Sequence, residues 1–198
     1  IHLAAISNDP AALLDSKITW ETNVLNTYHL LELCKKNKIK KFLFASSGSV
    51  YGVSKNKKVT ESTNLLPISD YNKTKMIGEK IVERYKKHFD TIILRPGTVC
   101  GFSKALRLDL TVNAMTYDSI IKKKIVVNGG SQIRPQLHID DMVNAYIFFL
   151  KKKKVGIYNI GFENFSINKI SKIIKQNNKN CKIVKNRLND IRSYRLNS

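Results

Sequence analysis

A tyrosine and a lysine four residues apart could form an acid–base pair on one ligand. The spacing Tyr-x-x-x-Lys occurs twice, as Tyr51/Lys55 and Tyr71/Lys75. Tyr71 and Lys75 fall at the start of a predicted helix, where residues four apart share a face. Tyr51 and Lys55 fall in a loop that contains glycine and serine, where nothing fixes the geometry between them. The sequence therefore predicts that Tyr71 and Lys75 are the rigid pair.

Small hydroxyl side chains follow a predicted buried strand at residues 41–46. Ser47 and Ser49 belong to the segment Ser-Ser-Gly-Ser-Val-Tyr-Gly at residues 46–52. In open parallel sheets, ligands bind outside the carboxyl ends of the strands. A single serine after a strand is usually turn chemistry, but a serine cluster together with a helical Tyr/Lys pair is much rarer. We therefore expect Ser47 and Ser49 to face a substrate.

The elements that must position these side chains follow from the apolar pattern. Apolar runs between turn residues predict strands at 1–5, 41–46, 92–94, 125–127, 137–139, 155–160 and 183–184. Three- and four-residue apolar periodicity predicts helices at 20–34, 71–88, 108–122, 140–150 and 167–174. Strands that alternate with helices at this spacing indicate βαβ units and a parallel sheet. We expect Asp140 and Ser166 to cap the last two helices, Asp141 to anchor its helix, and His138 to pack within its strand.

Composition bounds the class of protein. The 198 residues include 35 Lys+Arg against 15 Asp+Glu, a formal net charge of +20. A basic chain invites a nucleic-acid hypothesis, but the lysines are spread out and are not interleaved with stacking aromatics, so we do not expect nucleic acid. No apolar run is long enough to span a bilayer, and the three widely spaced cysteines make neither a disulfide framework nor a zinc site. We expect a cytoplasmic protein without a metal site.

Eight short motifs occur along the chain in a fixed order. They are HLAA (2–5), NVLNT (23–27), SSGSVYG (46–52), YNKTK (71–75), LRPGTVCG (94–101), RPQLHIDD (134–141), YNIG (158–161) and DIRSY (190–194). With these motifs the chain resembles the extended short-chain dehydrogenase/reductase family, the NAD-dependent nucleotide-sugar epimerases and dehydratases. The resemblance implies an α/β fold: a Rossmann-like doubly wound parallel sheet, later strands only, with a smaller α/β substrate-binding region.

The resemblance also implies roles for the predicted pair. Tyr71 acts as acid and base on a sugar hydroxyl, and Ser47 hydrogen-bonds the reacting oxygen. Lys75 holds the nicotinamide ribose and, with the nicotinamide ring, lowers the pKa of Tyr71 from its usual value of about 10. Hydride passes to NAD to give a keto-sugar. In an epimerase the hydride then returns to the other face of that keto-sugar.

Further site residues are implied by position in the motifs. The cofactor NAD is expected to contact Ala4, Ala5, Asn23, Tyr71, Lys75 and Pro96. The substrate, a nucleotide-diphosphate sugar, is expected to contact Ser47, Ser49, Thr98, Asn113, Arg134 and Arg192. The two arginines suit the diphosphate because the guanidinium fork matches phosphate oxygens.

Three departures from the family pattern carry information. The glycine-rich phosphate loop and the acid that reads the ribose hydroxyls are absent from this sequence. We therefore expect an N-terminally truncated chain with an incomplete C-terminus. In that case residues 1–100 are the later part of the NAD-binding domain, and residues 101–198 are a mixed region that returns to it near 135–160. Gly48 and Ser49 stand where 4,6-dehydratases carry Asp and Glu, which disfavours elimination of water.

The leading hypothesis is an epimerase similar to UDP-glucose 4-epimerase. The chain also resembles family branches that serve polysaccharide synthesis. The resemblance implies a homodimer joined through the helices near 23–38 and 71–88. One alternative is a reductase or dehydrogenase on the same fold that uses NAD or NADP. An alternative of another class is a non-catalytic relative that senses cofactor or binds RNA. Such relatives usually lose the tyrosine or the lysine first, and this chain has both, as Tyr71 and Lys75.

Overall fold

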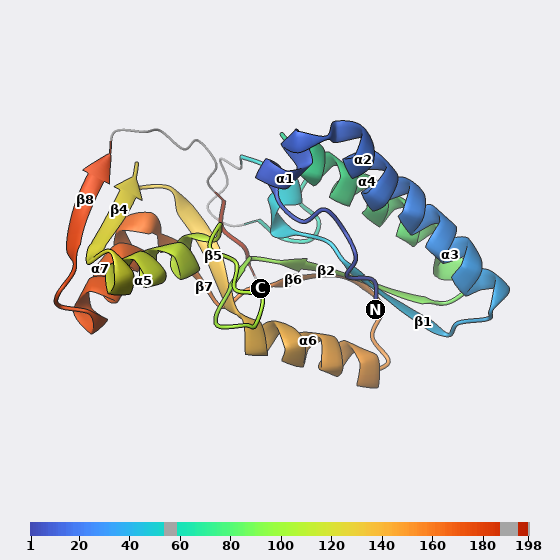
Figure 1. Ribbon diagram of the computed structural model, residues 1–198. Coiled ribbons are helices and arrows are strands. Elements are labelled where there is room, and N and C mark those ends of the chain that lie inside the picture. Colours follow the sequence, from blue (N-terminus) through green and yellow to red (C-terminus); the bar gives the residue numbers. More distant parts are fainter. Residues whose placement is uncertain (54–58, 187–193, 198) are drawn as a thin grey trace.

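The computed structural model describes residues 1–53, 59–186 and 194–197 (Figure 1). The helices are α1 (Asp9–Leu14), α2 (Ser16–Trp20), α3 (Asn26–Lys36), α4 (Asp70–Arg84), α5 (Thr111–Ile121), α6 (Ile139–Lys151) and α7 (Ile167–Asn177). The strands are β1 (Lys41–Ala45), β2 (Asp90–Pro96), β3 (Thr98–Cys100), β4 (Lys124–Asn128), β5 (Ile133–His138), β6 (Gly156–Ile160), β7 (Glu163–Ser166) and β8 (Lys182–Asn186). No helix in these ranges is long and apolar enough to cross a membrane.

The main sheet has the order β1-β2-β6, with all three strands parallel. Helices α3 and α4 cover one face of this sheet and α6 covers the other (Figure 1). Strands buried on both faces explain the near-continuous apolar sequences of β1 and β2. The α/β class and the Rossmann-like layering expected from the sequence are confirmed.

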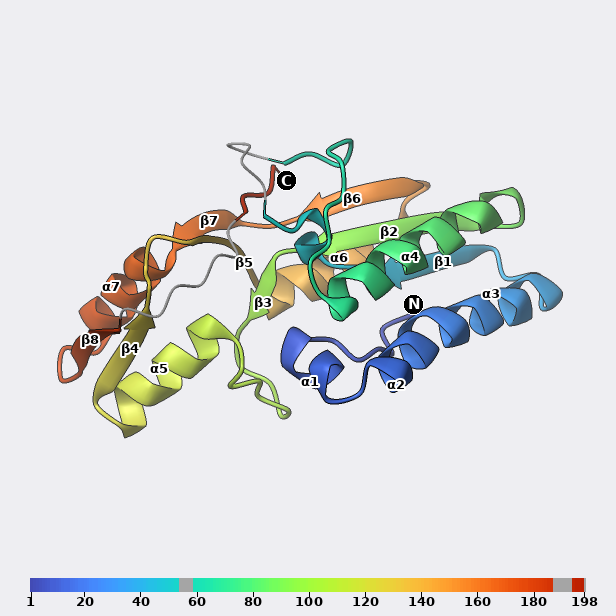
Figure 2. The same cartoon turned by 90° about the horizontal axis from the view of Figure 1, so that it is seen from above.

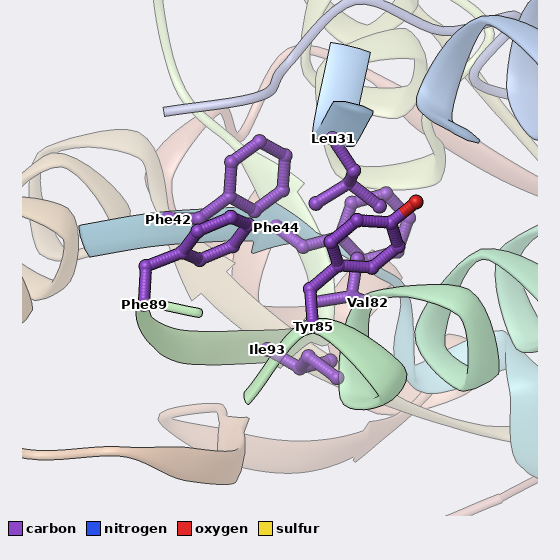
Figure 3. Close-up of a cluster of buried hydrophobic side chains, with 7 residues drawn as sticks. All are labelled: Leu31, Phe42, Phe44, Val82, Tyr85, Phe89 and Ile93. Atoms are coloured by element: carbon purple, nitrogen blue, oxygen red, sulfur yellow. The ribbon is translucent and has the colours of Figure 1, made fainter. Parts of the chain in front are cut away.

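A core of aromatic side chains joins α3 and α4 to the sheet (Figure 3). Leu31 of α3 and Val82 of α4 pack on β1 and β2 together with the rings at 42, 44, 85 and 89. Gly78 on α4 is required here, because a Cβ at this position would lie 2.7 Å from the Phe44 ring. The glycine therefore lets α4, and the Tyr71/Lys75 pair on it, approach the sheet closely.

A second lobe lies beside the main sheet (Figure 2). It contains the sheets β3-β5-β7 and β4-β8 with helices α5 and α7. Met115, Ile125 and Ile170 belong to its separate apolar core. β6 follows α6 and returns the chain to the main sheet, where it pairs with β2.

Several sequence predictions are corrected by the structure. The predicted strand at 1–5 is reduced to one parallel bridge between His2 and Phe44. The predicted single helix at 20–34 contains a π-helical stretch (Glu21–Leu25) before α3. Strands β3 and β7 were not predicted, because each is short and half-buried and carries little apolar pattern.

The start of α6 also differs from its prediction. His138, not Asp140, caps the helix: its Nδ1 accepts the backbone N–H of Asp140 at 3.3 Å. His138 is exposed and is therefore not packed within its strand. Asp140 and Asp141 lie in the first helical turn, where a carboxylate favours the helix dipole. Ser166 does cap α7, as predicted, by accepting the Lys169 N–H.

Candidate active site

A cleft of about 390 Å³ opens where β1 and β2 end. Ser47 and Ser49 lie in the 3-10 turn region after β1, and Tyr71 projects from the first turn of α4. The cleft is lined by residues 7–10, Ser46, Ser47, Ser49, Gly52, Ile68, Tyr71, Asn72, 96–99, Arg107, Asp109, Leu110, Thr111, Arg134 and Tyr194. The two serines and Tyr71, which the sequence singled out separately, thus meet in one cavity.

The hydroxyl groups of Ser47 and Ser49 form a hydrogen-bonded series with Asn72. The Oγ atoms of Ser47 and Ser49 lie 2.8 Å apart, and Ser49 Oγ donates to Asn72 Oδ1 at 2.6 Å. The Ser47 side chain also acts on the Tyr71 phenol, whose pKa it lowers. The series therefore orients the Ser47 hydroxyl on the side of the cleft where Tyr71 lies.

Lys75 lies one turn after Tyr71 and is 5% exposed. Its Nζ donates to the Ala45 carbonyl at 2.9 Å, at the end of β1. Burial lowers the pKa of Lys75 to about 8, and the nearby Glu79 carboxylate opposes that shift. An ammonium has three donors, so two N–H groups of Lys75 remain beyond this contact.

The acidity of Tyr71 differs from the expectation. Burial raises its pKa above 10, the nearby Asp9 carboxylate raises it further, and the hydrogen bond with Ser47 and the charge of Arg107 oppose the rise. Lys75 points at a backbone carbonyl instead of the phenol. The predicted direct lowering by Lys75 is therefore wrong for this structure.

Asn23 holds the N-terminal segment against α4. Its side chain accepts the Ile6 N–H at 2.8 Å and donates to the Ile6 carbonyl and to Thr74 Oγ1, both at 3.0 Å. Asn23 is 2% exposed, so every polar atom of its amide is paired inside the protein. Its action is to fix the chain that leads into the cleft.

The other predicted site residues are distributed unevenly. Pro96, Thr98 and Arg134 line the cleft. Ala4 and Ala5 follow the His2 bridge, at the same sheet edge as Ser46. Among the residues that the structure describes, Asn113 lies outside the cleft lining; its amide accepts from Gly101 N–H and donates to the Arg107 carbonyl, so it holds the loop before α5. Arg192 and Lys55 lie outside the described residues.

Three charged groups of the cleft, Asp9, Arg107 and Asp109, were missed by sequence reasoning. Arg107 makes a two-pronged ion pair with Asp109, at 3.1 and 2.6 Å. Asn8 donates to the same carboxylate at 3.1 Å. This contact ties the second lobe to the N-terminal segment across the cleft, and only a fold can bring residues about a hundred positions apart together.

The donor set suits the nicotinamide half of a dinucleotide. Ala4 follows the His2 bridge, Ser46 follows β1, and Pro96 is the last residue of β2. All three lie at the carboxyl ends of parallel segments, where such sheets bind ligands. Lys75 keeps two N–H donors for ribose hydroxyls. Within the described ranges, no group of three or more His, Cys, Asp or Glu side chains could hold a metal ion.

Comparisons with known proteins identify the family of this chain. Residues 1–161 match the family model described as "NAD dependent epimerase/dehydratase family". The chain is 33% identical over 193 residues to a dTDP-D-glucose 4,6-dehydratase of Dictyostelium discoideum, covering 88% of this chain and 44% of that protein. It is 31% identical to a putative UDP-glucose 4-epimerase of Methanocaldococcus jannaschii, covering 88% and 59%. The chain thus spans about half the length of these relatives.

Solved structures agree. The UDP-glucuronic acid 4-epimerase of Bacillus cereus, in complex with UDP-glucuronic acid and NAD, matches with a TM-score of 0.85 at 30% identity, covering 98% of this chain and 63% of that one. The NAD-dependent NDP-hexosamine 5,6-dehydratase TunA matches with a TM-score of 0.90 at 22% identity, covering 99% and 66%; at that identity the likeness concerns the fold alone.

Proposed function

Because the chain belongs to the NAD dependent epimerase/dehydratase family, we propose that the protein that contains it is an NAD-dependent epimerase of a nucleotide-diphosphate sugar. The reaction passes through a transient keto-sugar. We assign the catalytic roles to Tyr71, Lys75 and Ser47. NAD, when bound, would accept the hydride and later donate it back.

The side chains of the cleft divide the work. The Tyr71 phenolate takes the proton of the sugar hydroxyl, and the phenol formed in this way gives the proton back. Ser47 holds the reacting oxygen beside it. The series Ser47–Ser49–Asn72 orients the Ser47 hydroxyl. Lys75, fixed by its hydrogen bond to the Ala45 carbonyl, holds the nicotinamide ribose.

The observation that carries epimerisation over dehydration is the chemistry at positions 48 and 49. A Cβ on Gly48 would lie 3.0 Å from the Pro96 carbonyl and 3.2 Å from Tyr194, so an aspartate has no room unless these neighbours move. Ser49 supplies a hydroxyl that is already bonded to Asn72. The two cleft carboxylates are also engaged: Asp9 accepts from Ser69 and Asp109 pairs with Arg107. Positions 48 and 49, where the resemblance places the acid and base of a dehydratase, therefore carry no carboxyl group.

The charge of Arg134 favours a diphosphate-bearing substrate. Arg134 lines the cleft, and its charge acts on the Tyr194 phenol at the same wall. A guanidinium there suits diphosphate oxygens. The net charge of +20 attracts such an anion from a distance.

The test is a product analysis of the protein that contains this chain, with NAD and either UDP-glucose or UDP-galactose. We expect the two sugars to interconvert without accumulation of NADH. NMR of the anomeric protons detects the interconversion. A 4-keto-6-deoxy product would instead identify a dehydratase, and one NADH per turnover a dehydrogenase. Tyr71→Phe should abolish interconversion, whereas Tyr117→Phe, at a 41% exposed position on α5, should leave it intact.

We further propose that the protein is a homodimer through α3 and α4. Leu25, Tyr28 and Leu33 are 47%, 45% and 57% exposed, and Leu25 and Tyr28 line a shallow apolar hollow with Ile81 of α4. Exposed apolar stripes of this kind mark helix–helix interfaces. Light scattering should give a mass twice that of the monomer, and the Leu33→Glu variant should have the mass of one monomer.

A further inference from the structure

One buried ion pair contacts both ends of the segment that carries Ser47 and Ser49. We call residues 46–51 the serine segment. We propose that Glu79 and Arg95 are positioning residues, which hold the serine segment at its first and last residue and so fix Ser47 against Tyr71. The effect on catalysis rests on the proposed function, whereas the holding of the serine segment rests on the geometry alone.

The first end of the serine segment is held by α4. Ser46 Oγ donates to Glu79 Oε1, and the Ser46 N–H donates to the Leu94 carbonyl at 2.9 Å. Lys75, one turn before Glu79, binds the preceding carbonyl of Ala45. Side chains from two consecutive turns of α4 therefore bind Ala45 and Ser46, the two residues just before Ser47.

The last end is held by β2. Arg95 Nη1 donates to the Tyr51 hydroxyl at 2.8 Å, and that hydroxyl donates to Asn159 Oδ1 on β6 at 2.8 Å. The Arg95 guanidinium also lies 5.0 Å from the Tyr51 ring centroid. Tyr51 is 1% exposed. The sequence placed Tyr51 in a loop without fixed geometry; its hydroxyl is instead held by two hydrogen bonds.

The ion pair joins the two ends. Arg95 Nη2 lies 2.6 Å from Glu79 Oε2 and Arg95 Nε lies 2.9 Å from Oε1. Both side chains are 3% exposed. Burial opposes the charge on Arg95, but the contacts with Glu79 and Tyr51 outweigh it and raise the pKa of Arg95.

A buried ion pair is weak evidence for stability, because desolvation offsets much of its Coulomb energy and apolar replacements are often as stable. What an apolar pair cannot supply is the remaining hydrogen bonds. After binding each other, Glu79 still accepts from Ser46, and Arg95 still donates to Tyr51 and to the Glu61 carbonyl at 3.1 Å. Two of these three contacts reach the two ends of the serine segment, so positioning accounts for the pair.

The exchange measurement uses variants that leave both side chains of the ion pair in place. Tyr51→Phe removes the contact at the last end and Ser46→Ala removes the contact at the first. Amide hydrogen exchange at Val50 and Gly52, which donate within the serine segment and its turn, should become at least about tenfold faster in both. Matched controls are Tyr158→Phe, which removes a hydroxyl bonded to Val155, and Ser171→Ala, which removes a buried hydroxyl bonded to Asn168.

Kinetics test the catalytic consequence. In Tyr51→Phe and Ser46→Ala we expect kcat to fall about tenfold or more with KM for the nucleotide sugar within twofold, because only the reacting oxygen loses its alignment. Arg95→Lys keeps a charge for Glu79 but loses the fork that reaches Tyr51. Its loss in kcat should match that of Tyr51→Phe, and the double variant should lose no more than either single one.

Unchanged exchange in both variants would overturn the holding of the serine segment. Faster exchange with unchanged kcat would overturn its role in positioning Ser47. If the unaltered protein fails to interconvert sugars, the proposed function fails, while the exchange measurement still decides whether Glu79 and Arg95 hold the segment.

Discussion

Replacing Lys75 by methionine should change how the stability of the protein depends on pH. Lys75 is buried, and its charge is opposed by desolvation, so its pKa is about 8 in the folded protein against 10.5 in the unfolded chain. Methionine has a stem of similar length and cannot carry a charge. The comparison of the two proteins therefore isolates the proton on Lys75.

The sign and size follow from proton linkage. Below pH 8 both the folded and unfolded chains hold the proton, and the buried charge destabilises the fold. Between pH 8 and 10.5 the unfolded chain holds a proton that the folded protein has lost, so stability rises by about 1.4 kcal/mol per pH unit. From pH 7 to 9.5 the unaltered protein should gain about 2 kcal/mol relative to Lys75→Met.

The assay is urea unfolding followed by circular dichroism at half-unit steps from pH 7 to 9.5. The thiols of Cys34 and Cys100, whose pKa values burial raises, titrate in both proteins and cancel in the difference. Lys80→Met, at an exposed position on α4, is the control and should show a constant difference. Parallel stability curves for the unaltered protein and Lys75→Met would refute the reasoning, since they would mean that the Lys75 ammonium is no worse solvated in the fold than in the unfolded chain.

Three further changes have defined outcomes. Gly48→Ala should cost about 1–3 kcal/mol in urea unfolding, because its Cβ meets the Pro96 carbonyl at 3.0 Å; an unchanged midpoint would show that position 48 has room and would weaken the case against dehydration. Asn23→Ala should cost about 2 kcal/mol, because it leaves the Ile6 backbone and Thr74 without their partner, and it should speed exchange of the Ile6 amide; slow exchange there would mean that the N-terminal segment is held by other contacts. Ile125→Ala, at a fully buried position in the second lobe, should cost about 2–5 kcal/mol; a loss below 1 kcal/mol would show that this core is loosely packed.

The local elements around the site could be predicted because their signals are local. The apolar runs of β1 and β2 and the periodicity of α4 each depend on neighbouring residues, and the spacing of Tyr71 and Lys75 on a helix sets their common face. The eight ordered motifs also pointed to the family that residues 1–161 match. Boundaries were less accurate, as with α5, which begins at Thr111 instead of 108, since several residues can cap the same turn.

The tertiary structure alone decided which polar groups meet. Glu79 and Arg95 were not singled out by the sequence, and Tyr51 was assigned to a loop without fixed geometry. Each of these residues finds its partners on a different element, so their bonds exist only once α4 packs on the sheet. The same holds for the pKa of Lys75, which depends on burial that spacing cannot reveal. The sequence by itself determined that a tyrosine, a lysine and two serines stand at the end of a parallel sheet. The packing of α4 against β1 and β2 decided how they are held, because hydrogen bonds between distant residues are set by the fold and not by the order of the chain.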